Sequence, residues 1–328
     1  MRVPLMPESG IPGRGLAAVS GAILEFQMCV ASSAGDDYQR GEILEEQCRQ
    51  WAEVWTGDTI RRIPRIPAKP LWEIFAGTRE VAEMAKDGVH LPLGYLEATA
   101  EIYGIDLRGT YTWLVQGKNR KERTNVLQVL AKSAKLRGGL VTVIEPEGTQ
   151  WRSFAASEGF EYLSGFEDYQ TFFGTSFVPD FVSRNQKKKA LLAKDMPEEE
   201  IYHRMREDRT RYLIITDLCR FAKMLHTEDR KLLEAQMTNL LDKGFLHNIY
   251  AFAGMNPDDR TEVLDNTIFR TFTAPKAGIH LGGRIPEQRI FDFSTMPFSE
   301  QNTPEKAGRG VTAPTEAEEW HRIVLPIA

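Results

Sequence analysis

Eight consecutive residues carry the clearest chemical signal in the sequence. Residues 117–124 follow the pattern G-x-x-x-x-G-K-[ST] at its first glycine and at its final hydroxyl residue. In a loop of this pattern, backbone amides and a helix N-terminus hold phosphates, a lysine reaches the terminal phosphates, and the hydroxyl binds magnesium. The candidate nucleotide-binding residues are Gly117, Lys118, Asn119, Arg120, Lys121, Glu122, Arg123 and Thr124.

Two residues in this segment depart from the pattern. Glu122 stands in place of the second glycine, and Arg123 stands in place of the lysine. A carboxylate about 5 Å from a phosphate charge, at an effective dielectric of about 20, costs roughly 3 kcal/mol, or about a hundredfold in affinity. Arginine does not replace the lysine, because its planar fork is longer than a compact ammonium group. The segment therefore predicts weak or absent binding of ATP and magnesium, with little or no hydrolysis. An ordinary strand-to-helix turn is the alternative interpretation.

A second candidate position is Asp217, which follows the apolar run 212–216. Nucleotide-hydrolysing enzymes hold magnesium through an aspartate at such a position and use a neighbouring acid to polarise water. Depending on the register, Thr216 or Leu218 fills the place of that second acid. Asp217 and Thr124 are therefore the candidate magnesium ligands, and no residue is predicted to be catalytic. The alternative role of Asp217 is a helix cap.

The elements that must position these residues are short apolar runs alternating with helical stretches. The runs are 112–116, 140–144, 212–216, 249–253 and 268–272. They are apolar almost throughout, which is typical of strands covered on both faces. Apolar residues at helical spacing between 126 and 134 predict a helix that joins the first two strands. We therefore expect an α/β fold with a mainly parallel sheet and helices on both faces.

The first 70 residues differ in pattern from the rest of the chain. They contain a hairpin expected over 14–19 and 22–30, a charged helix expected near 41–55, and three prolines between 64 and 70. Prolines at this density do not fit inside a helix or a central strand. We therefore expect a strap or linker over residues 1–70 and one domain over residues 71–328. Within that domain, the densely charged residues 185–211 are expected to form a solvated helical excursion.

Composition excludes several classes of protein. The chain has 328 residues, of which 42% are hydrophobic and 27% charged, as in an ordinary globular protein. Its net charge of -5 does not favour nucleic-acid binding. Its three cysteines form no Cys-x-x-Cys pair, which favours a reducing compartment over a disulfide framework. The sequence has no run of about 18 apolar residues, the length that a transmembrane helix needs.

In this order, the pieces resemble the FtsK/SpoIIIE-like ATPases, and most closely the C-terminal ATPase domain of the EssC/EccC-type motor of type VII secretion systems. The resemblance covers nearly the whole chain. The residues that carry it are Gly13 to Leu16, Glu25 to Gln27, Ile63 to Pro67, Leu91 to Gly94, the altered segment 117–124, the run 212–217, Gly308 to Gly310, and the closing strand expected at Ile323 to Pro326.

The resemblance implies a RecA-like P-loop NTPase fold at the cytoplasmic face of the cell membrane, with the membrane helices elsewhere in a longer chain. It implies that residues 1–70 come from the end of a preceding ATPase domain and that residues 71–328 are a degenerate P-loop domain. The implied partners are the preceding ATPase domains and WXG100-type secreted substrates, recognised through a C-terminal signal, and a hexameric ring is an arrangement that the family allows. No nucleic-acid partner is expected.

Three functions remain open at this point. The first is a weakly or non-hydrolysing domain that acts in substrate recognition and in the regulation of protein export. The second is an active ATPase in which Lys118 or Lys121 reaches back to the phosphates. The third is a DNA translocase, which kinship with FtsK would suggest but which the acidic charge balance disfavours.

Overall fold

The structure is a computed structural model that describes residues 14–19, 22–28, 36–57, 65–315 and 319–328. The chain divides into two compact units, Met1–Ile63 and Pro64–Ala328. In the first unit, strand β1 (Arg14–Val19) pairs antiparallel with β2 (Ala22–Gln27), and α1 (Asp37–Val54) follows. The hairpin and the charged helix are confirmed, although β2 ends earlier than predicted. The predicted turn between the strands lies outside the described residues.

The second unit is built on a mixed sheet, which has ten strands in the part of the chain that the structure describes. Their order is β4-β3-β12-β11-β10-β5-β9-β8-β6-β7. The run from β10 to β7 is parallel, and the pairs from β4 to β10 are antiparallel. The strands are β3 (His90–Leu96), β4 (Ile102–Asp106), β5 (Thr112–Gly117), β6 (Leu140–Glu145), β7 (Glu161–Ser164), β8 (Arg211–Ile215), β9 (Ile249–Met255), β10 (Gly278–Gly283), β11 (Glu305–Thr312) and β12 (Arg322–Val324).

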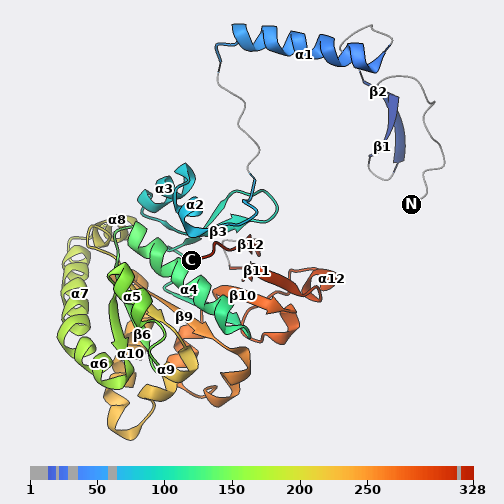
Figure 1. Cartoon of the computed structure of the whole chain (residues 1–328). Coiled ribbons are helices and arrows are strands. Elements are labelled where there is room, and N and C mark those ends of the chain that lie inside the picture. Colours follow the sequence, from blue (N-terminus) through green and yellow to red (C-terminus); the bar gives the residue numbers. More distant parts are fainter. Residues whose placement is uncertain (1–13, 20–21, 29–35, 58–64, 316–318) are drawn as a thin grey trace. The chain divides into compact units, whose positions relative to one another are not determined.

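Helices cover both faces of this sheet (Figure 1). One hydrophobic core lies between the sheet and α4, and the other lies between the sheet and α6, α9, α10 and α11. The expected α/β fold is therefore confirmed. The helices are α2 (Trp72–Ala76), α3 (Arg79–Lys86), α4 (Arg120–Leu136), α5 (Arg152–Glu158), α6 (Gly165–Phe172), α7 (Val178–Leu192), α8 (Glu198–Met205), α9 (Leu218–Leu225), α10 (Lys231–Lys243), α11 (Thr267–Thr273) and α12 (Phe298–Gln301), and a π-helical turn, Phe173–Phe177, joins α6 to α7.

One of the five predicted strands is wrong. Residues 268–272 belong to α11, not to the sheet. The side chain of Asn266 caps this helix by accepting a hydrogen bond from the main-chain N–H of Phe269 at 3.1 Å. Ile268 and Phe272 are four residues apart and both buried, so they share one helical face. A short apolar run alone does not distinguish this face from a strand.

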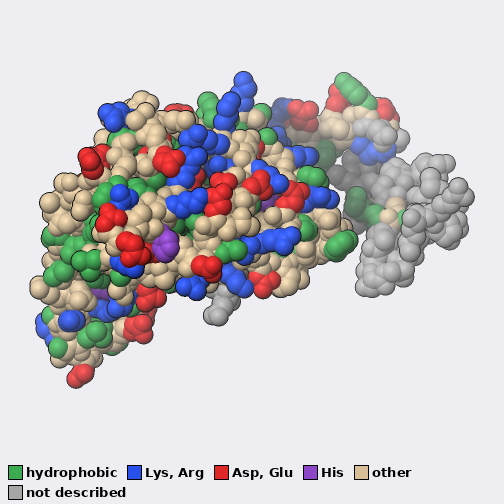
Figure 2. All heavy atoms as spheres, turned by 90° about the horizontal axis from the view of Figure 1, so that it is seen from below, with side chains coloured by type: hydrophobic (Ala, Val, Ile, Leu, Met, Phe, Trp, Pro, Cys, Tyr) green, Lys and Arg blue, Asp and Glu red, His purple; other side chains and the backbone are tan. Residues whose placement is uncertain are grey.

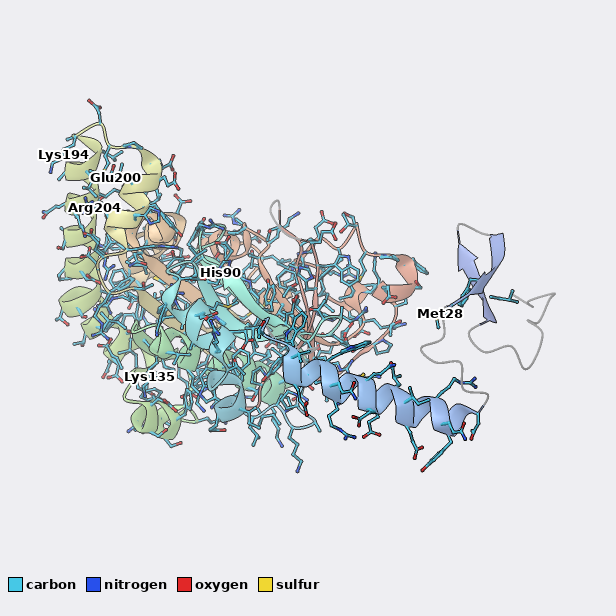
Figure 3. All side chains as sticks on the ribbon, turned by 90° about the horizontal axis from the view of Figure 1, so that it is seen from above. Met28, His90, Lys135, Lys194, Glu200 and Arg204 are labelled. Atoms are coloured by element: carbon cyan, nitrogen blue, oxygen red, sulfur yellow. The ribbon has the colours of Figure 1, made fainter. Side chains whose placement is uncertain are left out.

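The charged excursion expected over 185–211 is helical in the end of α7 and in α8, as predicted, but residues 193–197 and 206–210 are not helical and Arg211 begins β8. Figure 3 shows Lys194, Glu200 and Arg204 gathered at one end of the second unit. Arg204 forms an ion pair with Glu207 at 2.9 Å. The excursion is solvated on one side only, because Met205 is buried.

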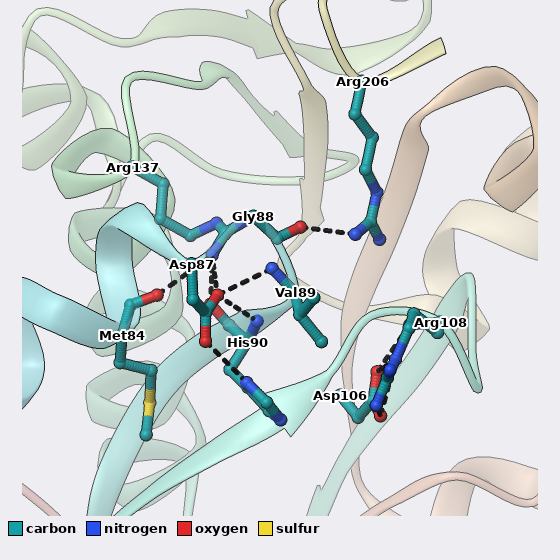
Figure 4. A network of polar contacts seen from close by, with 9 residues as sticks. All are labelled: Met84, Asp87, Gly88, Val89, His90, Asp106, Arg108, Arg137 and Arg206. Atoms are coloured by element: carbon teal, nitrogen blue, oxygen red, sulfur yellow. Dashed lines mark hydrogen bonds and ion pairs between the residues drawn. The ribbon is translucent and has the colours of Figure 1, made fainter. Parts of the chain in front are cut away.

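A polar network fixes the turn between α3 and β3 (Figure 4). The carboxylate of Asp87 accepts hydrogen bonds from the main-chain N–H groups of Val89 and His90, at 2.6 and 2.8 Å. Burial alone would raise the pKa of Asp87, but the hydrogen bonds from His90 and Val89 outweigh it and hold that pKa below its ordinary value. Arg137 and Arg206 donate to main-chain carbonyls of the same turn. Both arginines are thus used to hold the fold together.

Candidate functional site

The segment 117–124 forms a tight turn that leads directly into a helix. Strand β5 ends at Gly117 and α4 begins at Arg120, so only two residues lie between them. The side-chain oxygen of Asn119 accepts a hydrogen bond from the main-chain N–H of Lys121 at 3.0 Å and caps the helix. Residues 120–124 already belong to α4.

The backbone of this turn does not form a phosphate nest. A nest needs successive N–H groups that converge, which requires residues of right- and left-handed conformation in alternation. None of residues 117–124, all of which the structure describes, has a positive φ. The N–H of Lys121 is in addition taken by the cap. For a phosphate, the main chain of this turn therefore provides no more than the free N–H groups found at any helix N-terminus.

The guanidinium of Arg123 lies over this turn. It donates to the main-chain carbonyls of Gly117 and Lys118, the latter at 2.9 Å. Burial lowers the pKa of Arg123 from its ordinary value, and the charges of Asp217 and Asp259 oppose this shift. An arginine stays protonated under such conditions. The cation that replaces the lysine is thus engaged with the chain's own backbone.

Gly117 has a structural role that does not involve phosphate. A Cβ atom at this position would lie 2.7 Å from the carbonyl oxygen of Leu281 and 2.8 Å from its Cβ. Leu281 belongs to β10 and pairs with Gly117 in the parallel sheet. Close packing of β5 on β10 therefore explains the glycine that matches the first position of the pattern.

Asp217 lies at the carboxyl end of β8, separated from β5 by one strand, β9. Its carboxylate accepts a hydrogen bond from the main-chain N–H of Arg220 at 3.0 Å and caps α9. The guanidinium of Arg220 lies 3.6 Å from the same carboxylate and 2.7 Å from that of Glu147. The alternative interpretation of Asp217 as a helix cap is thus the arrangement that the structure has.

The candidate residues divide between two cavities. A cavity of about 280 Å³ brings together Arg120, Arg123, Thr124 and Asp217, which the sequence named. Lys118, Asn119 and Glu122 line a second cavity of about 230 Å³, and Gly117 and Lys121 line neither. The first cavity is also lined by Thr216, which the sequence placed beside Asp217 in the position of the second acid, and by residues that sequence reasoning missed, namely Pro146, Glu147, Trp151, Arg220, Asn256 and Asp259.

The positions of the missed residues in the sequence could have identified them. Glu147 follows β6, and Asn256 and Asp259 follow β9. Parallel strands bring their carboxyl ends to one edge of the sheet, where ligands of open α/β folds bind. Polar residues just after each predicted strand were therefore candidates for the same cavity as Asp217.

Lys118 turns away from the first cavity. Its Nζ atom lies 3.5 Å from a carboxylate oxygen of Glu287 and 3.7 Å from one of Asp258. Both distances allow ion pairs at the protein surface. In this arrangement Lys118 does not reach the space between Arg123 and Asp217.

The residues present do not fit a bound triphosphate with magnesium. The hydroxyl of Thr124 and the carboxylate of Asp217 are suitable ligands by type, but Arg220 contacts that carboxylate. The turn has no nest, and the guanidinium of Arg123 covers its carbonyls. Within the described ranges, no group of three His, Cys, Asp or Glu residues could hold a metal ion.

The strand order and the position of the cavity define the fold class. A helix enters directly after β5, the aspartate follows a strand two places away in the parallel sheet, and both meet at its carboxyl edge. This is the RecA-like α/β fold of P-loop NTPases. No protein-family model and no curated protein matches the sequence.

Solved structures show which known proteins share this fold. The chain is similar to the cytoplasmic domain of EssC, with a TM-score of 0.70 and 17% identity over 100% of this chain and 60% of that one. It is similar to Thermomonospora curvata EccC (ATPases 2 and 3) in complex with a signal sequence peptide, with a TM-score of 0.52 and 16% identity over 98% of this chain and 54% of that one. It is also similar to the pCW3 conjugation coupling protein TcpA with ATPγS, with a TM-score of 0.55 and 14% identity over 87% of this chain and 82% of that one.

The resemblance to EssC/EccC-type ATPase domains is thus confirmed at the level of the fold. The chain spans only about half to three fifths of the EccC and EssC chains that it matches. In the parts of the chain that the structure describes, no helix has the length and apolar character needed to cross a bilayer.

Proposed function

We propose that this chain is an ATPase-fold module of a type VII secretion motor that binds ATP weakly or not at all and acts through protein contacts. Its similarity to the EssC and EccC chains supports this role. Because it spans only part of those chains, its partners would include further ATPase domains of the same motor, with residues 1–70 as the end of a preceding one. The site of action would be the cytoplasmic face of the cell membrane.

The observation that carries the proposal is the position of Arg123. Its guanidinium bonds to the carbonyls of the turn before α4, where P-loop enzymes hold phosphate. A triphosphate would have to displace this contact, unwind the first turn of α4 and tolerate the carboxylate of Glu122. Each step costs free energy that phosphate binding must first offset.

An active ATPase is the second candidate, and one observation favours it. Thr124 and Asp217 line the same cavity, as a magnesium site requires. For the third candidate, a DNA translocase, the face drawn in Figure 2 gives no support. Figure 2 shows positive and negative side chains interspersed over one face of the molecule, without a broad basic tract.

Phosphate release distinguishes the first two candidates. We expect the purified chain at millimolar ATP and magnesium to release phosphate no faster than its Asp217→Ala variant, because the cradle is filled. The variant has lost the carboxylate that the motif assigns to magnesium, so it reports any contaminating ATPase. Steady release by the parent chain that Asp217→Ala abolishes would contradict the proposal.

A variant that restores two residues of the P-loop pattern tests why ATP would bind weakly. The double change Glu122→Gly and Arg123→Lys removes the carboxylate and supplies the compact ammonium of the pattern. We expect it to bind a fluorescent ATP analogue at least tenfold more tightly than the parent chain. Unchanged affinity would mean that the early start of α4, and not these two side chains, prevents binding.

Substrate recognition would need a surface for a peptide, and one cavity suits it. An apolar cavity of about 380 Å³ lies between α7 and α8 and is lined in part by Leu192, Ile201 and Tyr202. Apolar pockets that admit one or two anchoring side chains are typical of peptide recognition. We propose that this cavity receives the C-terminal signal of a WXG100-type substrate.

A pair of matched variants tests this cavity. Leu192→Asp places a charge at the cavity, whereas Val182→Asp places the same charge at an exposed position of the same helix outside it. We expect Leu192→Asp to reduce capture of a C-terminal substrate peptide at least tenfold and Val182→Asp to leave it within twofold. Equal capture by both variants would exclude this cavity.

A further inference from the structure

The hairpin of the first unit repeats a short sequence that occurs in the closing strands of the second unit. Residues 13–15 read Gly-Arg-Gly at the start of β1, and residues 308–310 read the same within β11. Each of these strands pairs antiparallel with the next strand of the chain, β1 with β2 and β11 with β12. The pair β1–β2 can therefore be compared with the pair β11–β12, residue by residue.

The two pairs also share their register. Gly15 lies opposite Phe26, and Gly310 lies opposite Ile323. Neither glycine has room for a Cβ atom, which would lie 2.6 Å from the ring of Phe26 at the first and 2.6 Å from the side chain of Ile279 at the second. A slip of one residue would reverse the faces of a strand. The common register therefore gives residues of β1 and β2 definite counterparts in β11 and β12.

In the second unit, β11 and β12 lie inside the ten-stranded sheet. β11 pairs with β10 on one side, and β12 pairs with β3 on the other. Both faces are covered as well, because Val311 and Ile323 are each 0% exposed and belong to different hydrophobic cores. The pair thus fills the gap between β10 and β3 and joins the two parts of the sheet.

The pair β1–β2 lacks such surroundings. The two strands form a sheet of their own, and neither pairs with a further strand in the described part of the chain. Phe26, the counterpart of the buried Ile323, is 41% exposed. An isolated two-stranded hairpin is only marginally stable in water, and open strand edges readily accept another strand. Both outer edges of the pair are therefore suited to a sheet that another domain supplies.

The identity of that domain follows from the gap that the pair would fill. The sheet of the second unit has no such gap, because its own β11 and β12 lie between β10 and β3. A second copy of the chain would first have to expel these strands and expose Val311 and Ile323 to water. The partner is therefore a domain that has this sheet but no closing strands of its own.

We propose that β1 and β2 complete the sheet of another ATPase-fold domain. β1 would lie beside the strand that corresponds to β10, and β2 beside the strand that corresponds to β3. For its partner, an ATPase domain of the same motor, this proposal rests on the proposed function. Strand pairing needs no nucleotide, so phosphate release by the chain would contradict the proposed function and leave this proposal standing.

Hydrogen exchange of the full chain by itself gives the first test. We expect the amides of β1 and β2 to exchange at least 100-fold faster than those of β11 and β12, because only the latter lie within a larger sheet. Sedimentation should show a monomer. Equal protection of the two pairs would overturn the proposal, and so would a dimer in which β11 and β12 lose their protection, since that dimer would exchange strands between copies.

The second test adds the partner. Hydrogen exchange is measured on the chain together with another ATPase domain of the motor, either joined to it on one polypeptide or added as a separate subunit. We expect β1 and β2 to gain at least 100-fold in protection, and the arm that shows the gain identifies the source of the domain. No gain in either arm would overturn the proposal.

A pair of matched variants locates the contact. Phe26→Asp should reduce the gain in protection at least tenfold, whereas Phe298→Asp, at a position of α12 that is 80% exposed, should change it by less than twofold. Leu16→Asp, at the counterpart of Val311, should act as Phe26→Asp does, and it keeps the test valid if Phe26→Asp disrupts the hairpin itself. Protection of β11 and β12 reports whether the second unit of each variant is folded. A full gain in both hairpin variants would overturn the proposal.

Discussion

Arg123 and Glu122 adjoin in sequence but serve two different cavities. The guanidinium of Arg123 turns toward the carbonyls before α4, on the side of Asp217. The carboxylate of Glu122 turns toward Gly282 and His280. Adjacent helical residues point about 100° apart, so a single motif can line two cavities. The sequence pattern identified both residues as departures from the P-loop pattern, but it assigned both of them to a single nucleotide-binding site.

At the scale of single residues, His280 predicts how the stability of the fold depends on pH. The folded chain holds its pKa near 4, against about 6.5 in an unfolded chain. The unfolded state therefore takes up a proton first as the pH falls, so this contribution to stability is complete above pH 6.5 and declines toward pH 4. Between pH 7.5 and pH 5 the loss is about 2 kcal/mol.

Urea unfolding of the parent chain and of His280→Gln checks this prediction. The variant keeps a polar side chain but has no group that titrates in this range. We expect the free energy of unfolding to fall by about 2 kcal/mol more in the parent than in the variant between pH 7.5 and pH 5. Parallel pH profiles would contradict the assignment.

At the scale of elements, the start of α4 decides what the site can do. The cap at Asn119 lets the helix begin at Arg120, within the segment that a P-loop leaves as an open turn. The sequence predicted the strand, the helix and their order correctly, because long apolar strands and helical spacing are strong local signals. It could not place the helix start, since caps shift helix ends by residues that local patterns do not fix.

The errors at this scale have a common physical cause. Residues 268–272 are apolar on one face of a helix, and five residues do not reveal the period. The antiparallel strands β3, β4, β11 and β12 were not predicted as a group, because some carry glycine or charge and depend on pairing with distant segments. Local patterns describe burial well but not which strands pair.

At the scale of elements, the close contact between β5 and β10 leads to a prediction about stability. We expect Gly117→Ala to lower the free energy of unfolding by about 1–3 kcal/mol, because its Cβ would overlap the backbone of Leu281. Gly174→Ala is the control, since a Cβ there meets nothing within 4 Å. Urea unfolding measures both. A cost for Gly117→Ala below that of the control would show that the strands separate easily at this point.

At the scale of the whole molecule, the sequence placed the change of pattern near residue 70, and the chain divides at Ile63 and Pro64. The three prolines between 64 and 70 therefore belong with the second unit. The last of them, Pro70, accepts a hydrogen bond from the main-chain N–H of Ile327 at 2.7 Å, which ties this segment to the other end of that unit. Such a contact between distant residues is not visible in local composition.

The guanidinium over the turn before α4 also bears on motion. Nucleotide-driven machines change shape because their sites alternate between a loaded and an empty form. Under the proposed function, a site that the chain fills with its own side chain would not alternate in this way. In an assembly with working ATPase domains, such a module would act as a stator, holding its shape through every turnover while its neighbours move against it.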